Sequence, residues 1–220
     1  MKKTALIVAG GSGLRMGSLI PKQFLLLKNK PILQHTLEKF YSTGIFDSII
    51  IVLPKSERKN WEKLIAEYKI TVPHTIVDGG SSRYESVKNG LRIVESDGLI
   101  AIHDGVRPFV TTDLIKRCMN ELIQNSNAIP SVSLSDTIRK VDGDSSMIID
   151  RESLKAIQTP QCFHTALLKS AYELSDDGSM TDDAAVFEKA GNKIRLIDGD
   201  PSNIKITVPN DIARAEAMLK

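Results

Sequence analysis

The chain has 220 residues, enough for a domain with a sizeable hydrophobic core, and we expect a single domain over residues 1–220. Charged residues amount to 25% and the net charge is +2, which excludes a protein that binds nucleic acid or a membrane surface through its overall charge. No apolar run can span a bilayer, and residues 5–9 are too few for the core of a signal peptide. Cys118 and Cys162 fit no metal-binding spacing, so we expect a cytoplasmic protein with reduced thiols.

Short apolar runs alternate with segments of helical periodicity along the first half of the chain. The sequence predicts strand 4–10, helix 31–42, strand 47–54, helix 56–68, strand 75–80, helix 81–94, strand 99–104 and helix 112–124. The strand runs are apolar throughout rather than alternating, which is typical of strands buried on both faces of a parallel sheet. We therefore expect an α/β fold in which helices flank a mostly parallel sheet.

The alternation breaks after Pro130. Two strand-like pieces flank the Asp-Gly-Asp sequence at 142–144, and this predicts a hairpin. No core-forming helix separates them, which indicates a protruding β-arm at about 136–160, either a dimerisation or lid element or an ordinary surface hairpin. Beyond the arm the sequence predicts helix 165–174, helix 181–190, strand 192–200, strand 203–207 and helix 209–220.

The segment after the first strand is rich in glycine and carries two cations. Met16 stands where the third glycine of a dinucleotide fingerprint would fall, and no Walker A lysine follows, so neither motif is present. Pro21 interrupts the segment and leaves a loop of roughly twenty residues before the next helix. Arg15 and Lys22 in this loop suit the charge that grows on a departing pyrophosphate, with solvated surface cations as the alternative.

Two further strands end in residues that suit a nucleotide. Asp104 ends the fourth predicted strand, where open α/β sheets bind ligands, and is a candidate Mg²⁺ ligand, directly or through water; a loop cap is the alternative. Gly79 and Gly80 end another strand and leave room for a flat base beside the backbone. The two strand ends together favour a nucleotide cradle. Arg107 is interpreted as a residue that braces this loop, and His103 as structural rather than catalytic.

Scattered polar residues indicate a second substrate that bears a phosphate. Lys205 falls within a predicted apolar strand, an unusual place for a lysine unless an anion pairs with it. The other candidates are hydroxyl or cationic side chains on the arm and in later loops: Thr137, Arg151, Thr159 and Thr181. A phosphate needs a basic, hydroxyl-rich pocket of this kind.

Taken together, these motifs resemble those of the 2-C-methyl-D-erythritol 4-phosphate cytidylyltransferase family, in order along nearly the whole chain. The matching stretches are AGGSGLRMGSLIPKQF, DGGSSRYESVKNGL, HDGVRP, DTIRKV, IDRESLKAIQTPQCF, TDDA and NIKIT. The resemblance implies a Rossmann-like nucleotidyltransferase fold and a homodimer whose β-arms hook around each other. It also implies transfer of CMP from CTP, with Mg²⁺, to 2-C-methyl-D-erythritol 4-phosphate. The products are 4-diphosphocytidyl-2-C-methyl-D-erythritol and pyrophosphate, on the non-mevalonate route to isoprenoids.

The resemblance also implies roles for single residues. Arg15 and Lys22 would stabilise the charged transition state at the α-phosphorus. The triphosphate would be wrapped by the glycine loop, through Ala9, Gly10, Gly11 and Gly13. Cytosine, ribose and metal would be held by Gly80, Ser81, Arg83, Ser86, Asp104 and Gly105. The sugar phosphate would contact Thr159, Thr181 and Lys205, together with Thr137 and Arg151 of the partner subunit.

The sequence departs from the family pattern at two places. The usual HDAARP reads HDGVRP, so that Gly105 and Val106 replace alanines, and Gly10 stands where alanine is frequent. None of these changes removes a charged or hydroxyl group that the reaction uses.

Three other functions compete with this interpretation. Ribitol 5-phosphate cytidylyltransferases share several motifs, but they tend to lack the IDR element and to carry TDAC in place of TDDA. A non-catalytic nucleotide sensor would not need the two loop cations together with Asp104 and Lys205. The missing third glycine disfavours a dehydrogenase.

Overall fold

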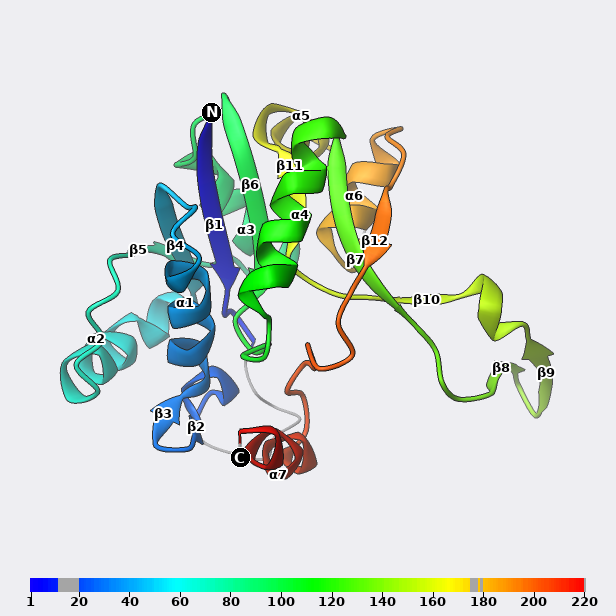
Figure 1. Cartoon of the computed structure of the whole chain (residues 1–220), viewed down its shortest axis with the longest axis horizontal. Helices are drawn as coiled ribbons and strands as arrows, with labels where there is room; N and C mark the ends of the chain where they lie inside the picture. Colours follow the sequence, from blue (N-terminus) through cyan, green and yellow to red (C-terminus); the bar gives the residue numbers. More distant parts are fainter. Residues whose placement is uncertain (12–19, 175–177, 179, 220) are drawn as a thin grey trace.

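The computed structural model describes residues 1–11, 20–174, 178 and 180–219, which form an α/β structure (Figure 1). The strands are β1 (Lys2–Val8), β2 (Leu26–Leu27), β3 (Lys30–Pro31), β4 (Ser48–Leu53), β5 (Thr75–Asp78), β6 (Gly98–Asp104), β7 (Asn127–Ser133), β8 (Ile138–Asp142), β9 (Ser145–Ile149), β10 (Lys155–Ile157), β11 (Gln161–His164) and β12 (Leu196–Asp198). The helices are α1 (Ile32–Ser42), α2 (Arg58–Glu67), α3 (Arg83–Arg92), α4 (Thr112–Gln124), α5 (Thr165–Ala171), α6 (Asp183–Lys189) and α7 (Pro209–Met218), with short 3-10 helices η2 (Lys22–Phe24), η3 (Lys55–Glu57) and η4 (Arg151–Ser153). The alternation of strands and helices predicted as far as α4 is confirmed.

The main sheet has the strand order β10-β7-β11-β6-β1-β4-β5, and β12 pairs with β7. Its centre is parallel. There β1 lies between β4 and β6, with Val8 level with Val52 on one side and with Asp104 on the other. β11 runs antiparallel to both β6 and β7. The predicted mostly parallel sheet is therefore confirmed, with antiparallel strands on one side.

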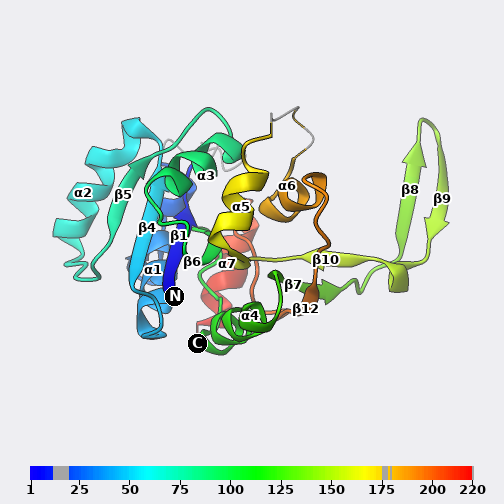
Figure 2. The same ribbon diagram turned by 90° about the horizontal axis from the view of Figure 1, so that it is seen from above.

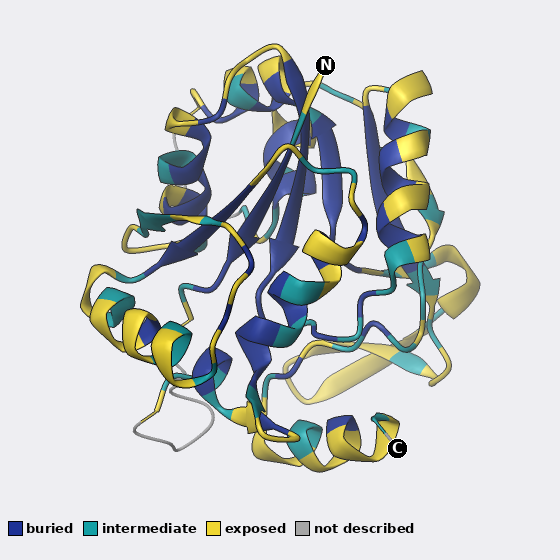
Figure 3. Cartoon of the chain, turned by 60° about the vertical axis from the view of Figure 1, so that its left-hand side comes forward, coloured by how far each residue is buried: buried dark blue, intermediate teal, exposed yellow. Residues whose placement is uncertain are grey.

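Helices cover both faces of the sheet because its central strands are apolar on both sides. In β1, Ala5 and Ile7 pack in one cluster with α1 and α4, whereas Leu6 and Val8 pack in another with α3, α5 and α6. Figure 2 shows these two groups of helices on opposite sides of the sheet, and Figure 3 shows the buried central strands. A third, smaller cluster joins α7 to the loop after β6.

The connections make the strand order reverse at β1. From β1 the chain builds outwards through β4 to β5, and then returns along α3 to β6 on the opposite side of β1. In open α/β sheets, ligands bind outside the carboxyl ends of the strands at such a reversal. The topology therefore places the expected site at the ends of β1 and β6, the strands that precede the glycine loop and end at Asp104.

Several elements differ from the prediction. Residues 203–207 form no strand, because Ile206 packs into the cluster with α7 instead of pairing in a sheet. The strand predicted at 192–200 is reduced to β12, and the two helices predicted after the arm are shorter than expected. Residues 155–157 at the end of the predicted arm lie in the main sheet as β10, paired with β7. Among the described helices, none has the length and apolar character needed to cross a membrane.

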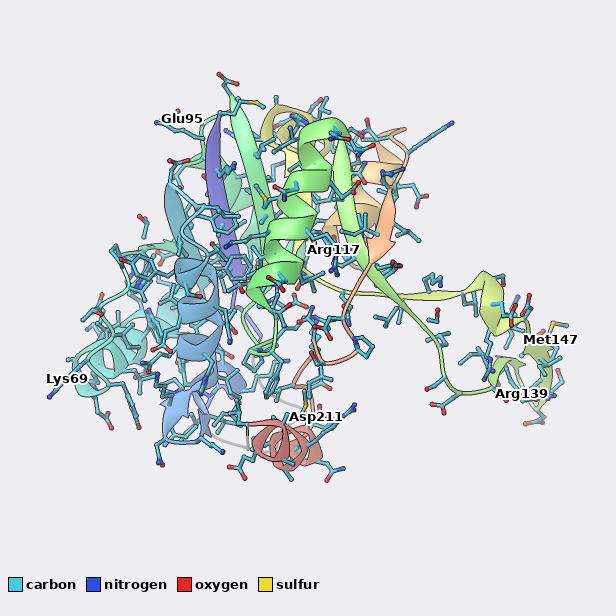
Figure 4. The ribbon with its side chains drawn as sticks, viewed as in Figure 1. Lys69, Glu95, Arg117, Arg139, Met147 and Asp211 are labelled. Atoms are coloured by element: carbon cyan, nitrogen blue, oxygen red, sulfur yellow. The ribbon has the colours of Figure 1, made fainter. Side chains whose placement is uncertain are left out.

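The predicted hairpin is formed by β8 and β9, which pair antiparallel along their whole length and project from the body (Figure 1). Gly143 in the turn has a φ of 55°, in the left-handed region that Asp-Gly turns use. Figure 4 shows Arg139 and Met147 on the arm, far from the sheet. Large apolar side chains are exposed there: Val141, Met147 and Ile148.

Candidate functional site

A cavity of about 300 Å³ opens where the strand order reverses. It is lined by Val8, Ala9, Gly10, Gly11, Lys22, Gln23, Gly80, Ser81, Ser82, Arg83, Ser86, Asp104, Val106 and Lys205. A larger and more open hollow of about 690 Å³ lies along α3 and shares only Ser81 and Ser82 with this cavity. We place the site in the smaller cavity because it lies at the carboxyl ends of β1 and β6 and gathers charged side chains.

Asp104 is a buried carboxylate surrounded by three cations. Lys205 Nζ lies 2.9 Å from its Oδ2 and Arg107 Nε lies 3.5 Å from the same oxygen. Arg83 Nε lies 3.7 Å from Oδ1. Burial alone would raise the pKa of Asp104, but the charges of Arg83 and Lys205 outweigh it and hold the pKa well below its usual range. Asp104 is therefore ionised throughout the neutral pH range, as a metal ligand has to be.

The NIKIT segment brings Lys205 to the cavity although it is not a strand. Asn203 is buried and its Nδ2 donates to the carbonyl oxygen of Thr159 at 2.8 Å. Ile206 is also buried, and its N–H donates to a carbonyl oxygen in the loop after β6 at 2.9 Å. Lys205 lies between these two anchors. The prediction that an anion pairs with this lysine is therefore met within the protein itself, by Asp104.

A chain of hydrogen bonds behind Asp104 fixes its backbone. The N–H of Asp104 donates to Thr159 Oγ1 at 3.1 Å, and Thr159 Oγ1 lies 2.9 Å from His103 Nδ1. His103 Nε2 lies 3.2 Å from the carbonyl oxygen of Arg107. These contacts fit the tautomer protonated at Nε2, in which His103 donates to Arg107 and accepts from Thr159. Burial lowers the pKa of His103 to about 3, so the ring is neutral and structural, as interpreted from the sequence.

The 3-10 helix η2 brings Lys22 back to the glycine loop. Gln23 is fully buried, and its Nε2 donates at 2.8 Å to the carbonyl oxygen of the residue that follows β1. Phe24 stacks on Trp61 of α2, with ring centroids 5.9 Å apart. The Lys22 side chain lies over Gly11, because a Cβ on that glycine would be 3.2 Å from Lys22 Cε. Gln23 and Phe24 are both buried and therefore hold the neighbouring Lys22 beside the backbone of the glycine loop.

The turn between β5 and α3 is shaped by serine hydroxyls. Ser82 caps α3, and its Oγ accepts the N–H of Glu85 at 3.1 Å. Ser86 Oγ accepts the N–H of Gly80 at 3.1 Å and would lie 3.5 Å from a Cβ on Gly10. One buried serine thus lies against both glycine turns, which brings together the two strand ends that favoured a nucleotide cradle.

Arg83 reaches the cavity from the first turn of α3 and is held from behind. Its Nη1 and Nη2 donate to the two oxygens of Asp183, at 2.9 and 2.6 Å. Tyr172 Oη donates to the same carboxylate at 2.6 Å. Burial alone would lower the pKa of Arg83, but the charge of Asp183 outweighs it and raises the pKa above its usual value. Arg83 is therefore charged at every pH at which the protein is folded.

Most of the predicted site residues lie together in this cavity: Ala9, Gly10, Gly11, Lys22, Gly80, Ser81, Arg83, Ser86, Asp104 and Lys205. Gly105 follows β6 directly and is buried. Thr159 lies behind Asp104, where its hydroxyl is already bonded. Val106, the departure from the family pattern, packs with Ile206 in the cluster around α7. Its larger side chain therefore fills core space without displacing a polar group.

The remaining predicted residues lie outside the cavity or outside the described part of the chain. Thr137 and Arg151 are exposed beside the open end of the β8–β9 hairpin, where Arg151 Nη1 donates to a carbonyl oxygen at 2.5 Å. Thr181 is exposed just before α6. Gly13 and Arg15 lie outside the described residues. Which of the predicted residues contact a substrate stays a prediction.

Three polar residues that hold the site in place were not predicted: Gln23, Tyr172 and Asp183. Gln23 stands next to Lys22 and Asp183 is the second aspartate of TDDA, so both lay within stretches already singled out. Tyr172 carried no signal, because a tyrosine near the end of a helix is ordinary. Its contact with Asp183 depends on the packing of α5 beside α6, which the sequence does not reveal.

Comparison with known proteins gives the same family over the whole chain. A family model for 2-C-methyl-D-erythritol 4-phosphate cytidylyltransferase matches residues 4–220. A relative of that name from Bacteroides thetaiotaomicron is 45% identical over 219 residues, which cover 100% of both chains. Another from Porphyromonas gingivalis is 40% identical and covers 99% of this chain and 98% of its own.

Solved structures agree with the sequence match. A crystal structure of 4-diphosphocytidyl-2C-methyl-D-erythritol synthase from Anaerococcus prevotii is 31% identical with a TM-score of 0.83, covering 99% of this chain and 98% of that one. A 2-C-methyl-D-erythritol 4-phosphate cytidylyltransferase from Thermus thermophilus is 28% identical with a TM-score of 0.80 and the same coverage. The structural similarity thus extends over nearly the whole chain. This chain belongs to the 2-C-methyl-D-erythritol 4-phosphate cytidylyltransferase family.

Proposed function

We propose that the cavity at the ends of β1 and β6 is where this chain transfers CMP from CTP to 2-C-methyl-D-erythritol 4-phosphate. The chain is a cytidylyltransferase, and its reaction forms 4-diphosphocytidyl-2-C-methyl-D-erythritol and releases pyrophosphate. One observation carries the placement: Lys22, Arg83 and Lys205 meet in one cavity, and Asp104 is the single carboxylate among the described residues that line it. Such an excess of positive charge suits a polyphosphate.

The chemistry requires charge and positioning more than a base. A 4-phosphate oxygen of the acceptor attacks the α-phosphorus of CTP while the bond from that phosphorus to the bridging oxygen breaks, and pyrophosphate leaves with the electron pair. The attacking phosphate is already ionised, so no proton has to be removed from it. Lys22 beside Gly11 is placed to stabilise the charge that grows on pyrophosphate, and Arg15 has the same proposed role. His103 is neutral and bonded at both nitrogens, so it takes no part in proton transfer.

The nucleotide lies, in this proposal, between the two glycine turns. The triphosphate follows the glycine loop from Ala9, and cytosine and ribose lie against Gly80 and its neighbours. Gly80 cannot be replaced without movement, because a Cβ there would be 2.3 Å from Glu85 Cβ. The missing side chain at this position lets a base approach the main chain closely.

Mg²⁺ is the metal ion that we propose for this site, and the residues present fit it. Asp104 is ionised and lines the cavity, and Arg83 is no closer than 3.7 Å to its Oδ1. The described residues contain no cluster of three or more acidic, histidine or cysteine side chains. Mg²⁺ commonly takes one or two carboxylates and completes its shell with substrate phosphates and water. Asp104 would hold the ion directly or through water, and the bound ion would neutralise part of the triphosphate charge.

We place the sugar phosphate near Lys205 and Thr181, with Thr137 and Arg151 of the partner subunit on its open side. A homodimer is part of this proposal because the arm projects away from the body of its own chain (Figures 1 and 4). Its exposed apolar side chains need a partner surface, and a second copy of the chain offers one.

The substrate is tested by release of pyrophosphate from CTP and Mg²⁺ in the presence of either polyol phosphate. We expect release with methylerythritol phosphate and little with ribitol 5-phosphate. Equal or faster release with ribitol 5-phosphate would overturn the choice of acceptor. Failure to turn over either acceptor, while CTP still binds, would favour a nucleotide sensor.

A further inference from the structure

We infer, on the basis of the proposed nucleotide contact of Arg83, that Asp183 and Tyr172 are positioning residues for CTP. They hold the guanidinium of Arg83 in the one orientation that faces the cavity. CTP affinity thereby depends on a carboxylate that does not line the cavity and belongs to α6.

Arg83 and Asp183 form a bidentate ion pair. Both terminal nitrogens of Arg83 donate to both oxygens of Asp183, in two parallel bonds of 2.9 and 2.6 Å. Asp183 is fully buried, whereas the Arg83 side chain keeps 27% of its surface exposed. A bidentate pair of this kind restricts the planar guanidinium to a single plane. Burying the carboxylate would be unfavourable without this pairing.

Tyr172 supplies the third bond to Asp183 and fixes it relative to α3. Its Oη donates to Asp183 at 2.6 Å, and its ring stacks on that of Tyr84, with centroids 4.8 Å apart. Tyr84 follows Arg83 on α3, and its own Oη donates to the carbonyl oxygen of Tyr172 at 2.9 Å. The carboxylate is therefore locked to the helix that carries the arginine.

Arg83 joins this cluster to the cavity. Its Nη edge is held by Asp183, while Nε lies 3.7 Å from Asp104. A free arginine has several rotamers, and ordering it when CTP binds would reduce affinity. Fixing it in advance removes that cost and keeps its charge beside Asp104. Asp183, the second aspartate of TDDA, thus orients Arg83, although the two residues lie 100 positions apart in the sequence.

Asp183→Asn is the direct test, because an amide keeps the shape but turns an N–H group toward the guanidinium. We expect KM for CTP to rise about tenfold, with a smaller change in kcat and in KM for the acceptor. Asp182→Asn is the matched control. Asp182 caps α6 and accepts from Gln161 Nε2, so the same change one residue earlier leaves Arg83 untouched. KM for CTP should stay within about twofold there, because asparagine caps a helix as well as aspartate does.

A double-mutant cycle that combines Asp183→Asn with Arg83→Gln separates a positioning role of Asp183 from a purely structural one. If Asp183 acts through Arg83, adding Asp183→Asn to Arg83→Gln should change KM for CTP by less than about twofold. Full tenfold additivity would overturn the inference. So would a Asp183→Asn variant that unfolds more easily but binds CTP as the wild type does. Arg83→Gln with an unchanged KM would contradict the proposed nucleotide contact itself, which keeps the two failures distinct.

Tyr172→Phe keeps the test possible if Asp183→Asn does not fold. It removes one hydrogen bond to Asp183 and preserves the ring stack on Tyr84. We expect KM for CTP to rise about two- to threefold while KM for methylerythritol phosphate is unchanged. An unchanged KM for CTP, or an equal rise for both substrates, would overturn the inference.

Discussion

Lys22 and Lys205 line the same cavity, but their surroundings differ. Lys205 Nζ lies 2.9 Å from Asp104, so a substrate phosphate that reaches it has to compete with that carboxylate. Lys22 lies over Gly11, on the side where the triphosphate is proposed to lie. The neighbouring Gln23 and Phe24 anchor it through a hydrogen bond and a ring stack. We therefore expect Lys22 to act on the charge that develops during the reaction more than on binding.

Lys22→Ala should lower kcat by about 10² to 10³ while weakening CTP binding by no more than about threefold, because the cation acts on charge that is fully present only in the transition state. Steady-state kinetics and calorimetric titration of CTP measure the two effects. Lys55→Ala is a matched control, since Lys55 also begins a three-residue 3-10 helix after a proline but lies outside the cavity. A loss confined to CTP affinity would contradict the transition-state role.

At the scale of elements, the arm and the cavity of one chain are separated. β8 and β9 project from the body, whereas the cavity lies at the ends of the central strands. β7 and β10 pair at the base of the arm and fix its direction. An arm held in this way is suited to reach into the site of a second chain.

Complementation between two inactive variants tests this arrangement. Lys22→Ala disables the cavity and Arg151→Ala disables the arm, so each variant alone should be nearly inactive. In a randomly mixed population half of the dimers are mixed, and each of these has one intact cavity facing one intact arm. About a quarter of the wild-type activity should return on co-expression. No recovery, although mixed dimers form, would show that each arm serves its own chain or none.

At the scale of the whole molecule, the buried polar residues behind the cavity make the fold sensitive to acid. His103 lies at the end of a central strand, in contact with Phe40 at a centroid distance of 4.9 Å, and burial lowers its pKa to about 3. In the unfolded chain the same group has an ordinary pKa near 6.5. Between these two values the unfolded chain binds a proton that the folded protein does not, so stability falls as pH falls. Asp104 adds to this loss once pH falls through the ordinary pKa of an aspartate, 3.8, because the folded protein keeps the pKa of this carboxyl well below that value.

His103→Asn should therefore flatten the pH dependence of stability. The free energy of unfolding of the wild type should fall by up to about 1.4 kcal/mol per pH unit between roughly pH 6 and pH 4 through this one group. The variant should lose that slope, although it is less stable at neutral pH, because asparagine can still accept from Thr159 but cannot reach Arg107. Urea unfolding of both proteins at a series of pH values in this range measures the free energy of unfolding. An unchanged slope would mean that His103 is protonated in the folded protein.

Patterns local in the chain were enough to predict the alternating strands and helices of the first half of the chain. Apolar runs gave β1, β4 and β6, because a strand buried on both faces must be apolar at every position. The Asp-Gly turn predicted the hairpin because its residues favour positive φ. The family was recognisable for the same reason: its motifs are short stretches whose spacing is visible without a structure. NIKIT was misjudged because its alternation of isoleucine with polar residues suits a packed loop as well as a strand.

Contacts between distant residues were decided by the tertiary structure alone. The sequence showed that Asp104 ends a strand with Arg107 three residues later, but only the tertiary structure puts Arg83 and Lys205 beside it. Nothing local indicates that Asp183 holds Arg83, because the pair forms only when α3 and α6 pack on the same face of the sheet. The sequence by itself therefore determined the central parallel strands, the hairpin and the class of reaction, since these depend on periodicity and short motifs. The tertiary structure decided which charges meet, because that depends on how the strands are ordered in space.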